Sequence, residues 1–168
     1  RTPQPGHAIW HFLPSRDSLR HTVRLLKPFN SVAPRIVLTD SPDRFFDAPI
    51  SRLVGFKVQP GDIGEARVEL DCGPHLHNPM HRVHGGVIAA LADAAMGIAF
   101  GRTLLEHEDF STIEMKVNFI RPVKDGLITA DAKVLERGLR VGFVDCEIRS
   151  ARGKRVATAT CTCTVISE

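Results

Sequence analysis

The sequence lacks the features that mark several large classes of protein. Its 168 residues carry a formal net charge of +3, and the basic residues are scattered rather than gathered into a run. This pattern does not indicate a nucleic-acid partner, although it permits local attraction for a phosphorylated ligand. The longest apolar run contains an acid and is too short to span a membrane, and no signal-peptide pattern is visible. We therefore expect neither a nucleic-acid nor a membrane partner.

Spacing typical of a metal or redox site is also missing. The four cysteines are Cys72, Cys146, Cys161 and Cys163. Cys161 and Cys163 share one face of a predicted strand, where they are poorly placed to form a disulfide. We interpret all four as reduced packing residues without a catalytic role, and therefore expect a cytoplasmic protein.

Four histidines lie close together, which invites a zinc interpretation; they are His75, His77, His81 and His84. Their spacing matches no closed structural zinc site, and no cysteine is well placed to complete one. We expect no metal ion and no other cofactor.

Proline divides the chain into two parts. Seven of the 11 prolines lie within residues 1–49, where they interrupt regular structure. We predict that residues 1–50 form an N-terminal extension of short elements, with a short amphipathic helix over Ser18–Lys27. Residues 51–168 form one domain, which is long enough to bury a core.

The second part follows a regular pattern. We predict two antiparallel strands, a helix and four further strands, over Leu53–Gln59, Gly64–Asp71, Gly86 to about Leu105, Thr112–Phe119, Gly126–Arg137, Val141–Ser150 and Arg155–Ile166. This order indicates an α+β fold, in which an antiparallel sheet curls around one central helix.

The helix is the unusual element. The run from His84 to Phe100, HGGVIAALADAAMGIAF, is apolar at almost every position and should be enclosed on several sides. Asp93 is the exception, and burying an ionised carboxylate costs several kcal/mol unless it is paired, so Asp93 is either a satisfied structural acid or a functional group. Gly85 and Gly86 let a ligand approach the backbone, and the first N–H groups of a helix suit a developing oxyanion. Together these features indicate carbonyl chemistry.

The spacing of these residues predicts a shared site. Asp93 lies eight residues beyond Gly85, or about 12 Å along the axis at about 1.5 Å per residue. One carbonyl cannot contact both groups within one chain, so a second subunit must supply one of them. A two-fold dimer with two shared sites is the simplest arrangement.

The region from about Leu53 to Ile166 resembles the hotdog-fold acyl-CoA thioesterases of the phenylacetate-degradation (PaaI-like) type. The most specific segments are Asn78-Pro79-Met80 and the run from Val83 to Gly97, VHGGVIAALADAAMG, and the segment Val117–Pro122 supports them. The resemblance implies a hotdog fold with an N-terminal extension outside it. It also implies a homo-oligomer with sites at the dimer interface, assembled as a dimer of dimers (a homotetramer).

The resemblance assigns five residues to catalysis. Asp93 matches the nucleophile or general base, and Gly85 matches the glycine whose N–H polarises the thioester carbonyl. His84 orients the glycine loop, Asn78 lies near the carbonyl and the attacking water, and Thr112 helps to place that water. Asn78, His84 and Gly85 would come from one subunit, and Asp93 and Thr112 from the other.

A further set of residues is expected to bind the CoA ester. Gly86 permits close approach, and His81 and Arg82 stand where many relatives have smaller residues such as glycine. Cations at strand ends and turns are candidate contacts for the CoA phosphates. They are Arg121, Lys124, Arg137 and Arg140.

The predicted activity is hydrolysis of an acyl-CoA or aryl-CoA thioester, with no cofactor besides the CoA of the substrate. The sequence leaves open whether Asp93 attacks the carbonyl or activates water. A hotdog hydratase is disfavoured, because its Asp and His are about five residues apart and in the opposite order. The alternative is a non-catalytic module that binds acyl-CoA or serves a structural role.

Overall fold

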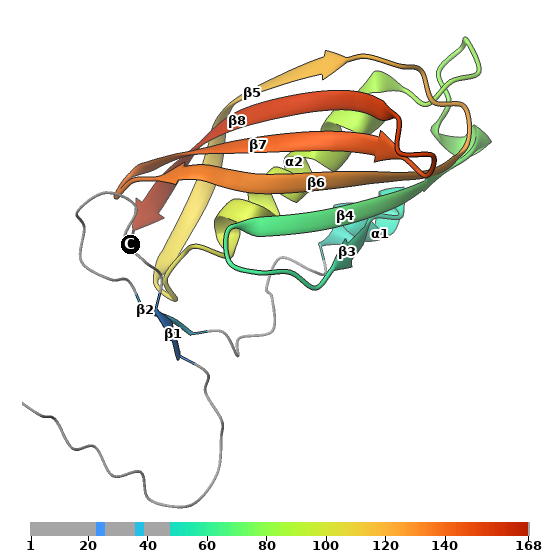
Figure 1. Ribbon diagram of the computed structural model, residues 1–168. Helices are drawn as coiled ribbons and strands as arrows, with labels where there is room; N and C mark the ends of the chain where they lie inside the picture. The colour runs from blue at the N-terminus through green and yellow to red at the C-terminus, as the bar shows by residue number, and fades with distance from the viewer. Residues whose placement is uncertain (1–22, 26–35, 39–47, 168) are drawn as a thin grey trace, which may run out of the picture.

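A computed structural model of the protein describes residues 48–167 and the two short strands β1 (Val23–Leu25) and β2 (Ile36–Leu38) (Figure 1). The helices are α1 (Pro49–Val54), a 3-10 turn at Pro74–Leu76 and α2 (Gly85–Gly101). The other strands are β3 (Lys57–Gln59), β4 (Glu65–Cys72), β5 (Glu108–Phe119), β6 (Gly126–Arg137), β7 (Val141–Ser150) and β8 (Arg155–Ser167).

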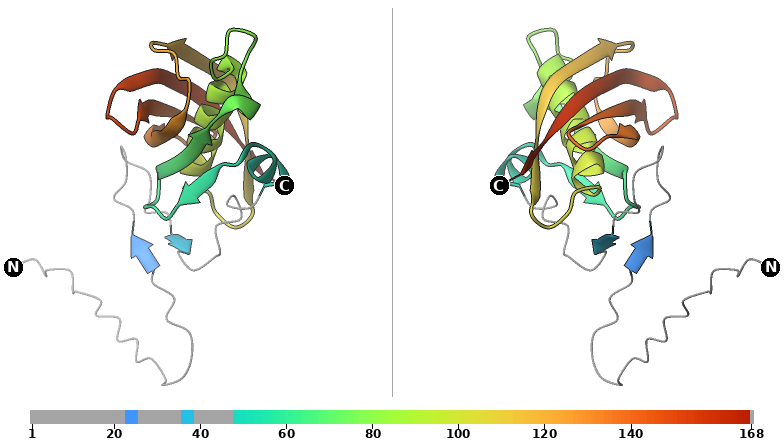
Figure 2. Two further views of the ribbon diagram at one scale, coloured as in Figure 1. Left: turned by 90° about the vertical axis from the view of Figure 1, so that its right-hand side faces the viewer. Right: turned by 90° about the vertical axis from the view of Figure 1, so that its left-hand side faces the viewer.

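Six of these strands form one antiparallel sheet in the order β3-β4-β6-β7-β8-β5. The sheet curves around α2, which packs against β4, β5, β6, β7 and β8 (Figure 2). This arrangement confirms the predicted α+β fold with an antiparallel sheet wrapped around a long helix. Among the described residues, no helix combines the length and the hydropathy needed to cross a membrane.

The core lies between the sheet and one side of α2. Alternate residues of β4 are buried, as expected for a strand with one face toward the core. From α2 the large side chains of Leu91, Met96 and Phe100 are fully buried. The opposite side of α2 carries small residues and is not covered within one protomer. Gly86 and Asp93 are exposed there, so the predicted enclosure of the helix on several sides is incomplete in the single chain.

Several predicted boundaries are wrong. Leu53 belongs to α1 rather than to a strand, because Pro49 favours the first helical turn and Gly55 ends the helix in the left-handed conformation, at φ 94°. Helix α2 ends at Gly101 rather than near Leu105, and the Thr103 hydroxyl donates to the carbonyl of Phe100 at 2.6 Å.

The helix predicted over Ser18–Lys27 is wrong at Val23–Leu25, which pair with Ile36–Leu38 as an antiparallel ladder. The other residues of that predicted helix lie outside the described part of the chain, as does most of the predicted extension.

The four cysteines are all buried with free thiols, and this makes a testable prediction. Burial raises the pKa of Cys72 from about 9.0 to about 11 and that of Cys146 to about 12. A folded pKa above the unfolded one stabilises the native state below about pH 9, and this contribution is lost as pH rises from 9 toward 12. We expect these thiols to resist alkylation at pH 8 in the native protein and to react in denaturant. We also expect the denaturation midpoint to fall steadily above pH 9, and a midpoint that stays constant up to pH 11 would contradict this account.

Candidate active site

The start of α2 is organised by His84, which is the residue that caps the helix. Its backbone is extended, and its Nδ1 atom accepts a hydrogen bond of 2.9 Å from the N–H of Gly86. Its carbonyl accepts from the N–H of Val87, also at 2.9 Å. Within the described residues, the N–H of Gly85 donates to no protein acceptor. One backbone donor at the positive end of the helix dipole is therefore available to a ligand oxygen.

Both glycines lie close to neighbouring side chains. A Cβ atom on Gly86 would lie 2.9 Å from Nδ1 of His84, and one on Gly85 would lie 3.3 Å from Cζ of Phe119. The first contact would break the cap, and the second would press on an aromatic ring. The glycine pair thus serves local packing as well as access to the backbone.

Substituting Gly86 tests the cap. We expect Gly86→Ala to lower stability by about 0.5–2 kcal/mol, the usual cost of a lost helix cap, and to lower turnover because the loop carrying Gly85 shifts. Denaturant midpoints and steady-state kinetics would measure the two effects. In a His84→Ala background the clash is absent, so Gly86→Ala should cost little more there. Equal costs in the two backgrounds would rule out the proposed clash.

The turn before α2 is held by Asn78. Its side-chain Oδ1 accepts from the N–H groups of Met80 at 3.0 Å and of Arg82 at 3.3 Å, so this oxygen is committed to the turn. The side-chain Nδ2 of Asn78 donates no hydrogen bond to any of the described residues. Inside the turn His81 adopts the left-handed conformation, at φ 55°, which glycine adopts more readily.

Asp93 and Thr112 form a second group. Asp93 lies on the exposed side of α2, and the hydroxyl of Thr112 on β5 donates to its Oδ1 at 3.4 Å. In the single chain, Asp93 and Thr112 lie beside each other near the middle of α2, whereas Asn78, His84 and Gly85 lie at or before its start. These are the same two groups that the resemblance assigns to different subunits.

A bulge in β5 determines that the side chain of Thr112 faces α2. The pairing with β8 shifts between Thr112 and Glu114, so Ile113 is an extra residue in the strand. Thr112 lies opposite the buried Cys163, and Met115 opposite the buried Cys161. Residues directly opposite each other share a face, so Thr112 and Met115 both face α2 although they are three residues apart.

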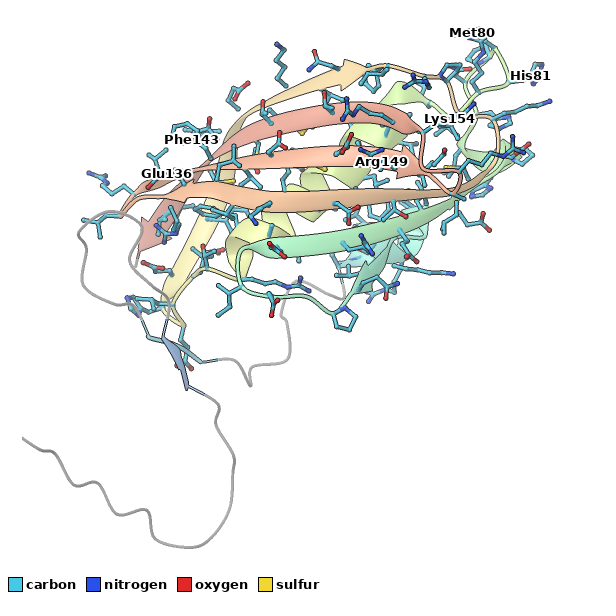
Figure 3. The ribbon with its side chains drawn as sticks, in the orientation of Figure 1. Met80, His81, Glu136, Phe143, Arg149 and Lys154 are labelled. Atoms are coloured by element: carbon cyan, nitrogen blue, oxygen red, sulfur yellow. The ribbon has the colours of Figure 1, made fainter. Side chains whose placement is uncertain are left out.

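The predicted phosphate contacts separate into two places. Arg82, Arg121 and Lys124 lie in turns near the start of α2, where the N–H of Val83 bonds the carbonyl of Val123 and His77 bonds the carbonyl of Lys124. Arg140 lies in the turn between β6 and β7, near the other end of the helix. Figure 3 shows both ends, with Met80 and His81 at one and Glu136 and Phe143 at the other.

Arg137 is not placed to bind a phosphate. Its side chain is 10% exposed, and its guanidinium pairs at 3.1 Å with Glu108, whose side chain is 6% exposed. It also donates to the hydroxyl of Thr103 at 3.2 Å and lies over the ring of Phe100. We therefore leave Arg137 out of the residues proposed below to contact CoA.

An apolar strip borders the site on β5, which is an edge strand of the sheet. Ile113, Met115 and Phe119 of β5, and Ile120 directly after it, are exposed in one protomer. Sequence reasoning did not foresee that Phe119 packs on Gly85, nor that Thr112 contacts Cys163. No local signal could have shown either contact, since each joins residues from elements far apart in the chain.

Within the described part of the chain, no three His, Cys, Asp or Glu side chains gather as a possible metal site.

The chain is similar in sequence to known proteins. Residues 80–157 match the model of the thioesterase superfamily. A Saccharolobus solfataricus protein that is provisionally named an esterase is 33% identical over 110 residues, which cover 66% of this chain and 78% of that protein. The medium/long-chain acyl-CoA thioesterase YigI of Salmonella typhimurium is 27% identical over 132 residues, which cover 70% of this chain and 85% of YigI.

A solved structure agrees with these sequence matches. The PaaI protein from the phenylacetic acid degradation operon of Escherichia coli superposes with a TM-score of 0.68 and 25% identity. The superposition covers 72% of this chain and 86% of PaaI. The residues matched by the family model include Gly85, Asp93 and Thr112.

Proposed function

Because this chain belongs to the hotdog-fold thioesterase superfamily, we propose that it hydrolyses acyl-CoA or aryl-CoA thioesters to the free acid and CoA. The observation that carries this proposal has two parts: the N–H of Gly85 at the N-terminus of α2, which has no acceptor among the described residues, and the exposed Asp93 farther along α2, which is bonded by Thr112 of β5. The first group can stabilise negative charge on a carbonyl oxygen, and the second can deliver or activate a nucleophile.

The chemistry follows from these groups. The Gly85 N–H donates to the thioester carbonyl oxygen, and this bond strengthens as charge grows on the oxygen. Asp93 then either removes a proton from a water oriented by Thr112 and Asn78, or attacks the carbonyl carbon to form a mixed anhydride that water later cleaves. In both routes the carbon–sulfur bond breaks, and the sulfur takes up a proton to leave as the CoA thiol.

The site we propose is shared between two copies of the chain. Gly85 and Asp93 are about 12 Å apart along α2, so one carbonyl reaches both only if they come from different subunits. The uncovered side of α2 carries small residues, and the neighbouring edge strand β5 exposes Met115 and Phe119. A second copy related by a two-fold axis would cover these surfaces and pair the open edge of β5. Two such dimers would form the proposed homotetramer.

The CoA phosphates are proposed to lie near the start of α2. Arg82, Arg121 and Lys124 are exposed there, and Arg121 donates to the carbonyl of Arg155 at 2.7 Å, which holds its guanidinium near the turn. Gly86 and His81 would line the path of the substrate. Arg140 lies far from these cations within one protomer and would contribute only from a second subunit.

Thiol release from a panel of CoA esters tests the proposal. The panel should include short, medium, long and aryl acyl groups, and CoA release should be followed with a thiol reagent at pH 7–8. The buried cysteines of the protein should not contribute to that signal. Turnover of at least one ester is the expected result. No turnover of any ester would overturn the proposed hydrolysis. If the esters nevertheless bound, a non-catalytic acyl-CoA-binding module would be the better account.

A further inference from the structure

The side chain of Cys163 connects the Asp93–Thr112 pair to the interior of the sheet. Cys163 lies on β8 directly opposite Thr112 and is 0% exposed. Its Sγ lies 4.0 Å from Oγ1 of Thr112 and 3.7 Å from Sγ of Cys161. Thr112 in turn bonds Asp93 at 3.4 Å. Four polar side chains therefore form a continuous row from the buried sheet to the exposed carboxylate.

The number of hydrogens gives this row a direction. An ionised carboxylate can only accept, so the single hydroxyl hydrogen of Thr112 points to Asp93. In the contact between Thr112 and Cys163, the thiol of Cys163 is therefore the donor and Oγ1 of Thr112 the acceptor. The thiol of Cys161 then donates to the sulfur of Cys163. With both sides of the hydroxyl occupied, its rotation is fixed.

We propose that Cys163 is a positioning residue of the hydrolytic site, whose thiol holds the hydroxyl of Thr112 toward Asp93. This inference rests on the roles proposed above for Asp93 and Thr112. Cys163 contacts neither substrate nor water, because it is fully buried, and it acts only through Thr112.

Ionisation of Cys163 would reverse this arrangement. Hydrogen bonds from Cys161 and from Thr112 lower the pKa of Cys163, although burial and the charge of Asp93 oppose the shift. The pKa of Cys161 is raised, by its hydrogen bond to Cys163, by burial and by the charges of Asp93 and Glu114. The residue of β7 that faces Cys163 is Gly142, which carries no charge.

Cys163 is therefore the thiol of the pair that ionises first as pH rises. Its thiolate would accept the hydroxyl hydrogen of Thr112 and turn it away from Asp93. We expect kcat to decline on the alkaline side for this reason.

Two substitutions of Cys163 in the full chain test the proposal. Cys163→Ala should lower kcat about three- to tenfold, the range expected for one neutral hydrogen bond, with KM changed less than twofold. Cys163→Ser keeps a donor and an acceptor and should restore most of the loss. Both variants should lose the alkaline decline of kcat that is caused by the thiolate. Cys146→Ala is the matched control, because Cys146 is equally buried but lies opposite Ala132 and Ala159.

The Thr112→Val background separates positioning from packing. If Cys163 acts through the hydroxyl, Cys163→Ala should have no further effect on kcat once that hydroxyl is gone. An equal loss in both backgrounds, or an unchanged kcat in Cys163→Ala, would overturn the proposal.

An infrared comparison keeps the test independent of turnover. The S–H stretching band that disappears in Cys163→Ala should shift to higher frequency in Thr112→Val, because the thiol has lost its acceptor. An unshifted band would also overturn the proposal. A wild-type protein that hydrolyses no ester would refute the proposed function instead, and the infrared result would still decide whether Cys163 holds Thr112.

Discussion

Asp93→Asn is expected to lower kcat for thioester hydrolysis by about 10²–10⁴-fold, the range for loss of a positioned general base. Asparagine has nearly the same shape but cannot attack the carbonyl or take a proton from water. Asp93 is exposed in the protomer and its contact with Thr112 is a single hydrogen bond, so the substitution should barely change stability. Steady-state kinetics and the denaturation midpoint of the same preparations would measure both effects. Asp145→Asn, an exposed position on β7, is the matched control and should retain full activity.

Mixing the Asp93→Asn and Gly86→Ala variants would test the shared site directly. A dimer that combines one Asp93→Asn subunit with one Gly86→Ala subunit has one site with both defects and one site with neither. Co-refolded mixtures should therefore be more active than either variant alone. If each site takes both groups from one chain, no mixture can contain an intact site, and the activity will not exceed that of the two variants measured separately. That outcome would refute the shared site even if Asp93 is essential.

Arg137→Met is expected to have the largest effect on stability, about 3–5 kcal/mol, because it leaves the buried carboxylate of Glu108 without its guanidinium partner. Glu108 also accepts from the N–H of Leu105 at 2.9 Å, so it fixes the loop between α2 and β5. The pair thus holds the end of the helix against the start of β5. Chemical denaturation would measure the loss.

Two comparisons make this prediction specific. Arg67→Met is the matched control, since Arg67 and Asp131 pair at 2.6 Å with side chains 58% and 42% exposed, and its loss should cost no more than about 1 kcal/mol. In Arg137→Met/Glu108→Met both charges are absent, so this double variant should recover much of the stability. If Arg137 instead contacts a CoA phosphate, Arg137→Met would raise KM for CoA esters while leaving stability almost unchanged.

The sequence predicts the regular elements well where local signals agree. Strands β6 and β7 begin and end at the predicted residues, because each combines alternation of buried and exposed residues with a turn at either end. The prediction is wrong at Leu53, where apolar residues suggested a strand but Pro49 and Gly55 delimit a helix. Short apolar runs do not distinguish the two, so the flanking proline and glycine decide.

The features of the candidate site also differ in whether local sequence predicts them. The His84 cap and the open N–H of Gly85 follow from neighbours in the chain, so a sequence can indicate them. The contact between Asp93 and Thr112 depends on how α2 packs on β5, and the burial of Arg137 depends on Glu108, which is 29 positions away. Spacing along the chain contains neither fact. A cation in a predicted turn is therefore a weak candidate for phosphate binding until its surroundings are known.

The extra residue in β5 has a consequence for comparing this chain with others. Thr112 and Phe119 face the same side of the sheet only because Ile113 shifts the alternation between them. A related strand that lacks the extra residue can be aligned with β5 either before Ile113 or after it. Aligning both halves requires a gap of one residue. A gapless alignment would match the Thr112 hydroxyl or the Phe119 ring to a side chain on the opposite face. Deleting Ile113 should likewise rotate one half of the strand, so either the hydroxyl beside Asp93 or the ring beside Gly85 would turn outward.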